Sequence, residues 1–310
     1  MTTVPSAANR RLFVVLNPVS GSCDAETVRR TLLTICQTVG VHCDIHTTAK
    51  DDDPAELTRE ALARGYDAMI AAGGDGTACQ VANGLLGSDT PMAILPVGTA
   101  NLLARELHIP LNLSAACQLA VEGKHFRAID IMQSERQLFL SHVSIGTYSR
   151  IAERTTPEAK RRFRQLAYVW NAIPELFGRH AFKFKLNIDG QRRKIRAAFI
   201  MIANVGEVGA GPLRWGPDIS PDDGRVNLCI VRAGTVWDYL RLIWHVVRFK
   251  HHAATLSSYM TATDHIYIRA SKRLPVRGDG EIVGTSPLEL KILRAAIRIV
   301  VPDSDQDDTR

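Results

Sequence analysis

At residues 68–77 the chain reads AMIAAGGDGT, an apolar run that breaks at a glycine-rich turn before a segment with helical character. Such a turn presents unpaired backbone N–H groups and the positive end of a helix dipole, and both favour phosphate. Asp75 lies inside the turn. A bound phosphate would repel this carboxylate unless a cation or a transferred proton stood between them, so the pattern favours Mg-nucleotide chemistry over anion storage. Taken alone, the motif is equally consistent with a tight structural turn.

Two further turns follow apolar runs in the same way. Residues 12–16 end at the sequence NPVSGS of residues 17–22, and residues 92–95 end at PVGTAN of residues 96–101. In an open α/β sheet, the turns from strand to helix form the ligand-binding edge. Three such turns predict one shared phosphate site. The candidate nucleotide-binding residues are Asn17, Ser20, Gly21, Gly73, Gly74, Asp75, Gly76, Thr77, Gly98, Thr99 and Asn101.

Strand and helix patterns alternate through the first part of the chain. This alternation predicts a doubly wound parallel sheet with helices on both faces. Asp24 and Asp53 are expected to be helix N-caps. The expected strands are 12–16, 42–47, 68–72 and 92–95, and the expected helices are 24–39, 53–64, 77–86 and 100–107.

From about residue 129 the hydrophobic pattern changes, and the apolar runs become short and partly alternating. Turn residues such as Asp189-Gly190 separate some of them, which predicts a second, β-rich domain. The Asp-rich residues 304–310 are expected to be a solvated tail. The expected strands are 139–144, 182–188, 195–203, 226–231, 265–269 and 288–292.

The composition is that of a soluble two-domain enzyme. The chain has 310 residues, which exceeds the usual size of one domain, and no apolar run approaches the ~20 residues that span a bilayer. Residues 1–9 lack an apolar signal core and are expected to be a disordered lead. The six cysteines show no C-x-x-C spacing, which favours reduced thiols and a cytoplasmic location. The net charge of +6 suits a protein that visits anionic membranes, although it is common in other proteins too.

The elements N-P-x-S-G, G-G-D-G-T and P-x-G-T-x-N begin in order at Asn17, Gly73 and Pro96. Through them the chain resembles, from about residue 11 to 302, the diacylglycerol kinase catalytic-domain family, which includes bacterial lipid kinases and sphingosine and ceramide kinases. The resemblance implies an α/β ATP-binding domain over 1–127, to which 294–310 return. It also implies a β-sandwich lipid-substrate domain over 128–293.

The activity implied by the resemblance is transfer of the γ-phosphate of ATP to a lipid hydroxyl, with Mg²⁺ bound by Asp75. Diacylglycerol is the default acceptor, and phosphatidylglycerol, sphingoid bases and other long-chain alcohols stay open. Many bacterial members continue the third motif with Asp, but Leu102 follows Asn101 here. This departure argues against borrowing the headgroup contacts of any one member.

The family's D-G-E element matches Asp279-Gly280-Glu281. The resemblance implies that Asp279 reaches across an interdomain cleft to take the proton of the acceptor hydroxyl, with Glu281 in support. Family members differ over which aspartate is the base, so Asp75 is an alternative. A plain hairpin turn is the structural alternative, and Gly278 stands where an apolar residue is usual.

A second acidic element reads SPDDGR over residues 220–225. Adjacent carboxylates before a glycine suit a hard cation. In related bacterial lipid kinases this region holds a structural Mg²⁺, which would map to Asp223 with the carbonyl groups of Ser220 and Arg225. An ordinary Asp-Gly turn before a strand explains the pattern almost as well.

Two basic and aromatic segments, 160–164 and 237–252, suggest contact with lipid. In the second, aromatic and apolar residues recur at helical spacing, with arginines and histidines on another face, as in a helix at a membrane interface. The alternative is that the apolar stripe packs on the sandwich. We expect a lipid substrate, peripheral contact with an anionic membrane and no nucleic-acid partner, and the oligomeric state stays open.

Two other functions are compatible with parts of the sequence. NAD kinases and phosphofructokinases also use G-G-D-G-T, so a soluble-substrate kinase is the nearest alternative, although the N-P-x-S-G and D-G-E elements argue against it. A lipid or nucleotide sensor without catalysis is the other. The presence of Asp75, Asn101, Asp279 and Glu281 argues against a sensor, because binding alone needs no base.

Overall fold

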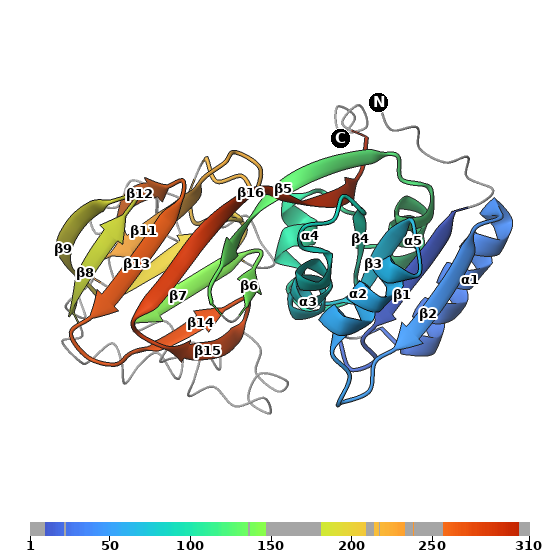
Figure 1. The fold of residues 1–310 in the computed structure, drawn as a ribbon, viewed down its shortest axis with the longest axis horizontal. Coiled ribbons are helices and arrows are strands. Elements are labelled where there is room, and N and C mark those ends of the chain that lie inside the picture. Colours follow the sequence, from blue (N-terminus) through green and yellow to red (C-terminus); the bar gives the residue numbers. More distant parts are fainter. Residues whose placement is uncertain are drawn as a thin grey trace. The chain divides into compact units, whose positions relative to one another are not determined.

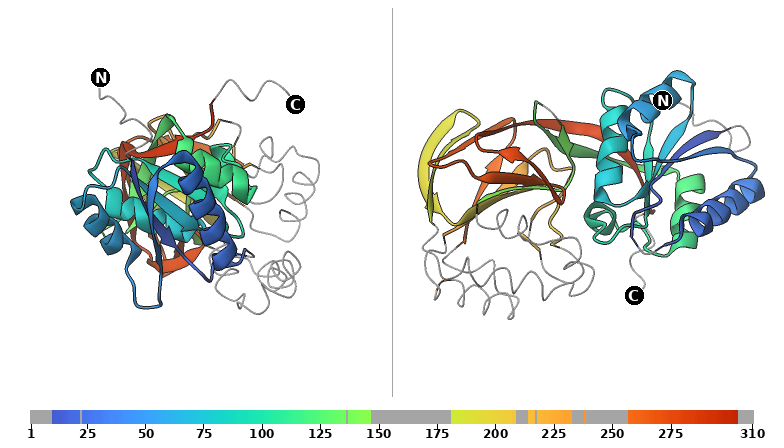
Figure 2. Two further views of the ribbon diagram at one scale, coloured as in Figure 1. Left: turned by 90° about the vertical axis from the view of Figure 1, so that its right-hand side faces the viewer. Right: turned by 90° about the horizontal axis from the view of Figure 1, so that it is seen from below.

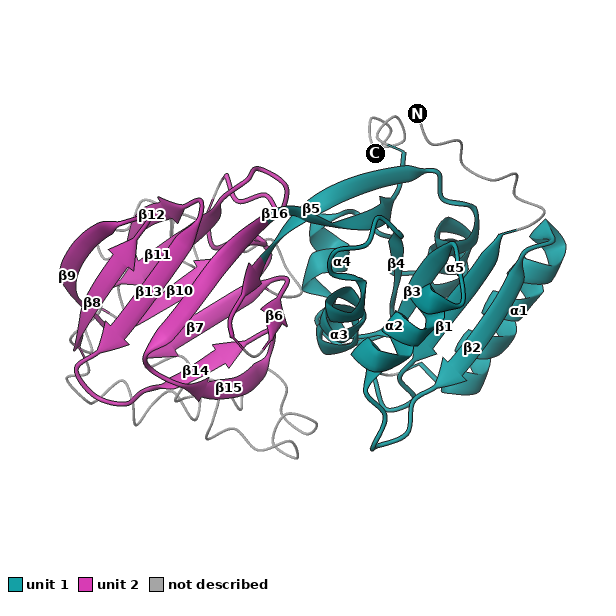
Figure 3. Ribbon diagram, in the orientation of Figure 1, with its two compact units in different colours: residues 1–131, 294–310 teal, residues 132–293 magenta. Residues whose placement is uncertain are grey.

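The computed structural model describes residues 10–303 except 22, 136, 147–180, 209–213, 217, 233–237 and 239–256. The basic segment 160–164 and, apart from residue 238, the segment 237–252 therefore lie outside the described residues. The chain forms two compact units, residues 1–131 with 294–310 and residues 132–293 (Figure 3). In the part of the chain that is described, no helix has both the length and the apolar character needed to cross a membrane.

The first unit is built on a parallel sheet (Figure 1). Its strands lie in the order β2-β1-β3-β4, and the last part of β16 (Leu288–Val301) adds to β4 in parallel, with Ile299 opposite Met92. The predicted parallel sheet is confirmed. The other strands are β1 (Arg11–Leu16), β2 (His42–Thr47), β3 (Ala68–Gly73) and β4 (Met92–Pro96).

Helices cover both faces of this sheet (Figure 2). One face is covered by α1 (Ala25–Val39) and α5 (Leu113–Glu122), which pack together, and the other by α2 (Pro54–Ala63) and α3 (Asp75–Leu85). The predicted N-caps are confirmed, because Asp24 accepts from the Thr27 N–H group and Asp53 from that of Ala55. The expected helix 100–107 is the shorter α4 (Leu102–Glu106), and α5 falls in a stretch where no element was expected.

The second unit consists of two sheets. The six-stranded antiparallel sheet has the order β12-β11-β10-β7-β14-β15, with β7 (His142–Gly146), β10 (Phe199–Ala203), β11 (Val226–Val231), β12 (Ser257–Ala262), β14 (Pro275–Gly278) and β15 (Glu281–Thr285). Facing it lie the first part of β16, β13 (His265–Ala270), β8 (Phe182–Ile188) and β9 (Gln191–Ala197). β5 (His125–Gln133) pairs with β16 and with the short β6 (Leu138–Phe139).

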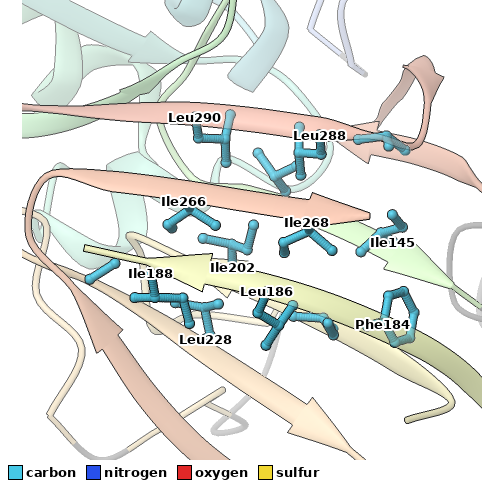
Figure 4. Packing of buried hydrophobic residues seen from close by; sticks show 14 of the residues in the cluster. Ile145, Phe184, Leu186, Ile188, Ile202, Leu228, Ile266, Ile268, Leu288 and Leu290 are labelled. Carbon is cyan, nitrogen blue, oxygen red and sulfur yellow. The ribbon is translucent and has the colours of Figure 1, made fainter. Parts of the chain in front are cut away.

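The core of this unit lies between the two sheets (Figure 4). Alternation along β8 places Phe184 and Leu186 in that core, where they meet residues of the other sheet such as Ile202 and Leu228. Burial of two apolar sheet faces against each other is the main source of stability of a sandwich. The predicted β-sandwich is confirmed.

The predicted bounds of three strands are wrong. The single strand 195–203 is two strands, because β9 pairs with β8 in one sheet whereas β10 pairs with β7 and β11 in the other. The chain changes sheets at Ala198. Likewise 139–144 is broken between β6 and β7, and 288–292 is only the first part of the longer β16.

A left-handed residue interrupts β16. Ala295 has φ of 48° and its N–H group donates to Asp130 Oδ1 at 2.8 Å. A residue with a Cβ atom is disfavoured here by about 1 kcal/mol relative to glycine. We therefore expect Ala295→Gly to raise the free energy of unfolding by up to about 1 kcal/mol in urea denaturation.

The matched control is Ala296→Gly, one residue along the same strand and without a positive φ. Glycine at a regular strand position should lower stability by about 0.5–1 kcal/mol. Shifts of the same sign and size in the two variants would contradict the left-handed conformation of Ala295.

Candidate active site

Three turns meet at the carboxyl edge of the parallel sheet. They follow β1, β3 and β4, on either side of the point between β1 and β3 where the strand order reverses. The Asn17 N–H group donates to Ala72 O at 2.9 Å, and the Gly98 N–H group donates to Gly73 O at 3.1 Å. Such a reversal is where ligands bind in open α/β sheets.

Three glycines of these turns are required by packing within the protein. A Cβ atom on Gly21 would lie 1.7 Å from Val97 O, and one on Gly98 would lie 2.3 Å from the Cα atom of Gly74. One on Gly73 would lie 2.3 Å from Thr77 Oγ1. The third turn therefore touches the other two through backbone atoms, and a side chain at Gly21 or Gly98 would separate them. A side chain at Gly73 would instead collide with Thr77 in its own turn.

Gly74 and Gly76 differ from those three. A Cβ atom on Gly74 would meet only the Gly98 Cα atom, at an ordinary 3.5 Å, and one on Gly76 would meet nothing within 4 Å. Neither residue has a positive φ. Packing within the described residues thus gives no reason for glycine at these two positions, whereas close approach of a ligand to the backbone does.

Asn17 joins the first turn to the start of α3. Its Nδ2 donates to Thr77 Oγ1 at 3.2 Å, while its Oδ1 accepts from the Val19 N–H group at 3.1 Å. Ser20 closes the turn by donating its N–H group to Asn17 O at 3.3 Å. The first and second turns are therefore held in one arrangement.

Asn101 fixes the third turn. It is buried, has φ of 51°, and its Nδ2 donates to Pro96 O at 2.8 Å and to Gly98 O at 2.9 Å. Its Oδ1 is buried and has no hydrogen-bond partner in the described structure. A buried acceptor without a partner is costly, so a donor supplied by a ligand or by water would satisfy this atom. Thr99, by contrast, is exposed.

Asp75 links the second turn to the third. Its Oδ1 accepts from the N–H groups of Leu102 at 2.7 Å and Leu103 at 3.4 Å, at the start of α4. Burial raises the pKa of the Asp75 carboxyl above its ordinary value, and the N–H bonds from Leu103 and Leu102 oppose that rise. A carboxylate beside a phosphate cradle, with a perturbed pKa, is suited to a cation or to a proton.

In the second unit, Asp279 lies at φ of 42° in the turn from β14 to β15. Its carboxylate accepts three backbone N–H groups, those of Leu140 at 2.7 Å and of Ser141 and His142 at 2.9 Å. Asn204 acts on the same bend, since its Nδ2 donates to Leu140 O at 2.9 Å. These bonds fix the break between β6 and β7.

The other residues of the D-G-E region take different roles. A Cβ atom on Gly278 would lie 2.1 Å from Phe139 Cε1, so glycine here makes room for a core phenylalanine. Glu281 begins β15, where it pairs with Gly278, and its exposed side chain forms no hydrogen bond or ion pair with any other described residue. The carboxylate of Asp279 is thus engaged by hydrogen bonds within the protein, whereas the carboxylate of Glu281 is available to bind a ligand or a proton.

The acidic side chains of residues 220–225 bind other residues of the same segment. Ser220 Oγ donates to Asp222 Oδ1 at 2.6 Å, and the two Asp223 carboxylate oxygens accept from the N–H group and the Nε of Arg225, at 3.1 and 2.9 Å. No cluster of three histidine, cysteine, aspartate or glutamate side chains suited to a metal occurs among the described residues. A cation at Asp223 would have to displace the Arg225 guanidinium.

Two residues near these sites belong to no sequence motif and were not predicted as site residues. His142 Nε2 lies 2.7 Å from Val205 O, and burial lowers the pKa of His142 to about 4, so the ring is neutral and donates through Nε2. Thr48 follows β2 at the same edge as the glycine turns, and its N–H group donates to Leu16 O at 2.8 Å. Only the pairing of β2 with β1 could have placed Thr48 there.

The contrast between the glycines gives a direct test. Gly98→Ala should lower the melting temperature measured by circular dichroism, because its Cβ atom would collide with the Gly74 backbone. Gly76→Ala should keep or raise it, since the site is open and alanine favours a helix by about 1 kcal/mol. Equal melting temperatures for the two variants would show that the turns do not touch as described.

Comparison with known proteins gives matches over nearly the whole chain. Residues 11–134 match the diacylglycerol kinase catalytic domain, and residues 141–301 match the YegS C-terminal NAD kinase β-sandwich-like domain. The diacylglycerol kinase of Bacillus subtilis (strain 168) is 28% identical over 299 residues, which cover 94% of this chain and 97% of the relative. The diacylglycerol kinase of Staphylococcus saprophyticus is 25% identical, with coverage of 96% and 98%.

Solved structures share the fold. Two from Bacillus anthracis str. Sterne superpose with TM-scores of 0.80 and 0.76, at 22% and 23% sequence identity. The match covers 98% and 96% of this chain, and 99% and 98% of the other chains. The second is a structure of a diacylglycerol kinase.

Proposed function

The chain belongs to the diacylglycerol kinase family and is a kinase, and we propose that it transfers the γ-phosphate of ATP to the hydroxyl group of diacylglycerol or a related lipid. The observation that carries this proposal is the pair Gly74 and Gly76. Both lie in a cradle of three turns, and neither is explained by packing within the described residues. Open backbone at a strand-to-helix turn is what a phosphate group needs.

ATP binding is assigned to the first unit. The N–H groups of residues 73–77 and of Thr99 would bind the donor phosphates. Asn17, Asn101 and Gly98, whose N–H group donates to Gly73 O, would keep the turns in place. Phosphoryl transfer depends mainly on positioning and on neutralising charge on the transferred group. A cradle whose turns are locked by backbone contact supplies the positioning.

Asp75 is the proposed magnesium ligand. Mg²⁺ usually binds through one or two carboxylates together with water and phosphate oxygens, so a single aspartate beside the cradle fits this ion. When bound with ATP, Mg²⁺ neutralises charge on the phosphate oxygens. Asp223 is left out of the proposal because Arg225 already binds both of its carboxylate oxygens.

Lipid binding is assigned to the second unit, and Glu281 is favoured over Asp279 as the base. The acceptor hydroxyl has a pKa far above 7, so a positioned carboxylate assists as the proton leaves. Three N–H bonds already occupy Asp279, whereas Glu281 is exposed and unpaired among the described residues. We assign Asp279 the role of holding the turn that presents Glu281, and Asp75 stays the alternative base.

The activity is tested by incubating the purified full chain with γ-labelled ATP and separate acceptors in micelles of a non-ionic detergent. The acceptors are diacylglycerol, phosphatidylglycerol, sphingosine and, without detergent, NAD. Labelled phosphatidic acid is the expected product. Label in NADP alone would make the protein a soluble-substrate kinase, and no label in any acceptor, with ATP still bound, would make it a sensor.

The base assignment predicts different defects in two variants. Glu281→Gln should lower kcat by about 10²- to 10⁴-fold, with the ATP affinity and melting temperature unchanged. Asp279→Asn should lower the melting temperature. In the wild type, backbone N–H groups donate to both carboxylate oxygens, and in the variant one of these oxygens is replaced by an amide nitrogen that cannot accept. Steady-state kinetics and thermal unfolding separate the two effects.

Glu289→Gln is the matched control, since Glu289 is also an exposed glutamate of the second unit. It should keep normal kcat and stability. Full turnover of Glu281→Gln, together with inactivity of Asp75→Asn at every Mg²⁺ concentration, would move the base to Asp75.

A further inference from the structure

The outer face of the β13-β8-β9 sheet is strongly basic. Alternation along β8 buries Phe184 and Leu186 and turns Lys183 and Lys185 outward, where both are exposed. β9, the outer strand of this sheet, continues the pattern (Figure 1). We call this surface the basic sheet face and define it by the exposed residues Lys183, Lys185, Arg192, Lys194, Arg196 and Arg269.

The strand register brings these cations into rows. Lys185 lies between Arg269 on β13 and Lys194 on β9, so three cations stand side by side across three strands. Lys183 is opposite Arg196 in the next row. Like charges directly opposite each other destabilise a sheet. The sequence therefore keeps an arrangement that folding itself disfavours.

Within the described part of the chain, no acidic side chain neutralises the basic sheet face. None of its six cations forms an ion pair with a residue that the structure describes. The acidic residues of this sheet and its turns bind other groups. Asp189 accepts the N–H groups of Thr263, Asp264 and His265, and Glu289 pairs with His265 at 2.9 Å.

The surface is also hollowed at these cations. A cavity of about 760 Å³ is lined by four basic side chains, two neighbouring residues of β8 and Tyr267. Tyr267 is half-buried and lies opposite Asn187. Tyrosine, with an apolar ring and a polar tip, is typical of surfaces that meet a membrane interface. The lining residues are Lys185, Leu186, Asn187, Arg192, Arg193, Lys194 and Tyr267.

We propose that the basic sheet face docks the protein on an anionic phospholipid bilayer, where headgroup phosphates neutralise its cations. The proposal rests on the proposed function, because a lipid kinase meets its acceptor at such a surface. A bilayer is favoured over a nucleic acid because a single aromatic side chain, Tyr267, lines the hollow, whereas a nucleic-acid groove stacks successive bases on several aromatic side chains. Each cation near an anionic membrane surface strengthens binding, so a cluster of six is ample for reversible association.

The test is co-sedimentation of the full chain with vesicles of phosphatidylcholine, with and without phosphatidylglycerol. Binding is expected only with phosphatidylglycerol and should weaken as salt is raised. The double variant Lys185→Gln/Lys194→Gln should bind about 30-fold more weakly, which corresponds to about 1 kcal/mol for each residue. Its melting temperature should not fall, since it removes charges from a row of like charge.

The control is Arg30→Gln/Lys124→Gln, which removes the same charge from exposed positions of the first unit. It should bind vesicles like the wild type. Equal weakening in both double variants, or in neither, would overturn the proposal, as would weakened binding to a nucleic acid duplex with vesicle binding unchanged.

A kinase assay separates this proposal from the proposed function. With diacylglycerol in non-ionic micelles, Lys185→Gln/Lys194→Gln should turn over normally, because the anionic surface is absent. If no lipid is phosphorylated by any form of the protein, the proposed function fails, and the vesicle result still decides the docking surface.

Discussion

The rest of the first unit depends on the backbone contact between Gly74 and Gly98. A side chain at Gly98 would lie 2.3 Å from the Gly74 Cα atom, so the turns after β3 and β4 meet only because Gly98 carries none. From this contact Asp75 reaches the N–H groups of α4, and Asn101 binds back to the turn of Gly98. The cradle is therefore held by contacts within the protein, which reduces the cost of binding and of positioning phosphates.

In the second unit, a carboxylate instead of a glycine contact holds a turn of the backbone in place. A bend between two strands leaves backbone N–H groups that must find acceptors, and Asp279 supplies both of its oxygens to three of them. In this short motif Asp279 thus holds the bend, and Glu281 is the acid that we propose as the base. Glu281, two residues on, stays exposed at the start of β15.

Much of this could be predicted from local sequence signals. The glycine turns, the caps at Asp24 and Asp53 and the change to short alternating strands all report local geometry. What could not be predicted depends on partners far along the chain. The change of sheets at Ala198, the bonds of Asp279 to the bend after β6 and the row of Arg269 with Lys185 all follow from strand register, which no local pattern contains.

If the three locked turns bind the phosphates of ATP, their backbone amides should be protected by the nucleotide. Hydrogen exchange of the full chain, followed by mass spectrometry with and without Mg-ATP, measures this protection. We expect slower amide exchange in residues 73–77 and 98–101 when Mg-ATP is present, and no change in the hairpin of β8 and β9. Saturating ATP binding that leaves exchange at both turns unchanged would show that the phosphates bind elsewhere.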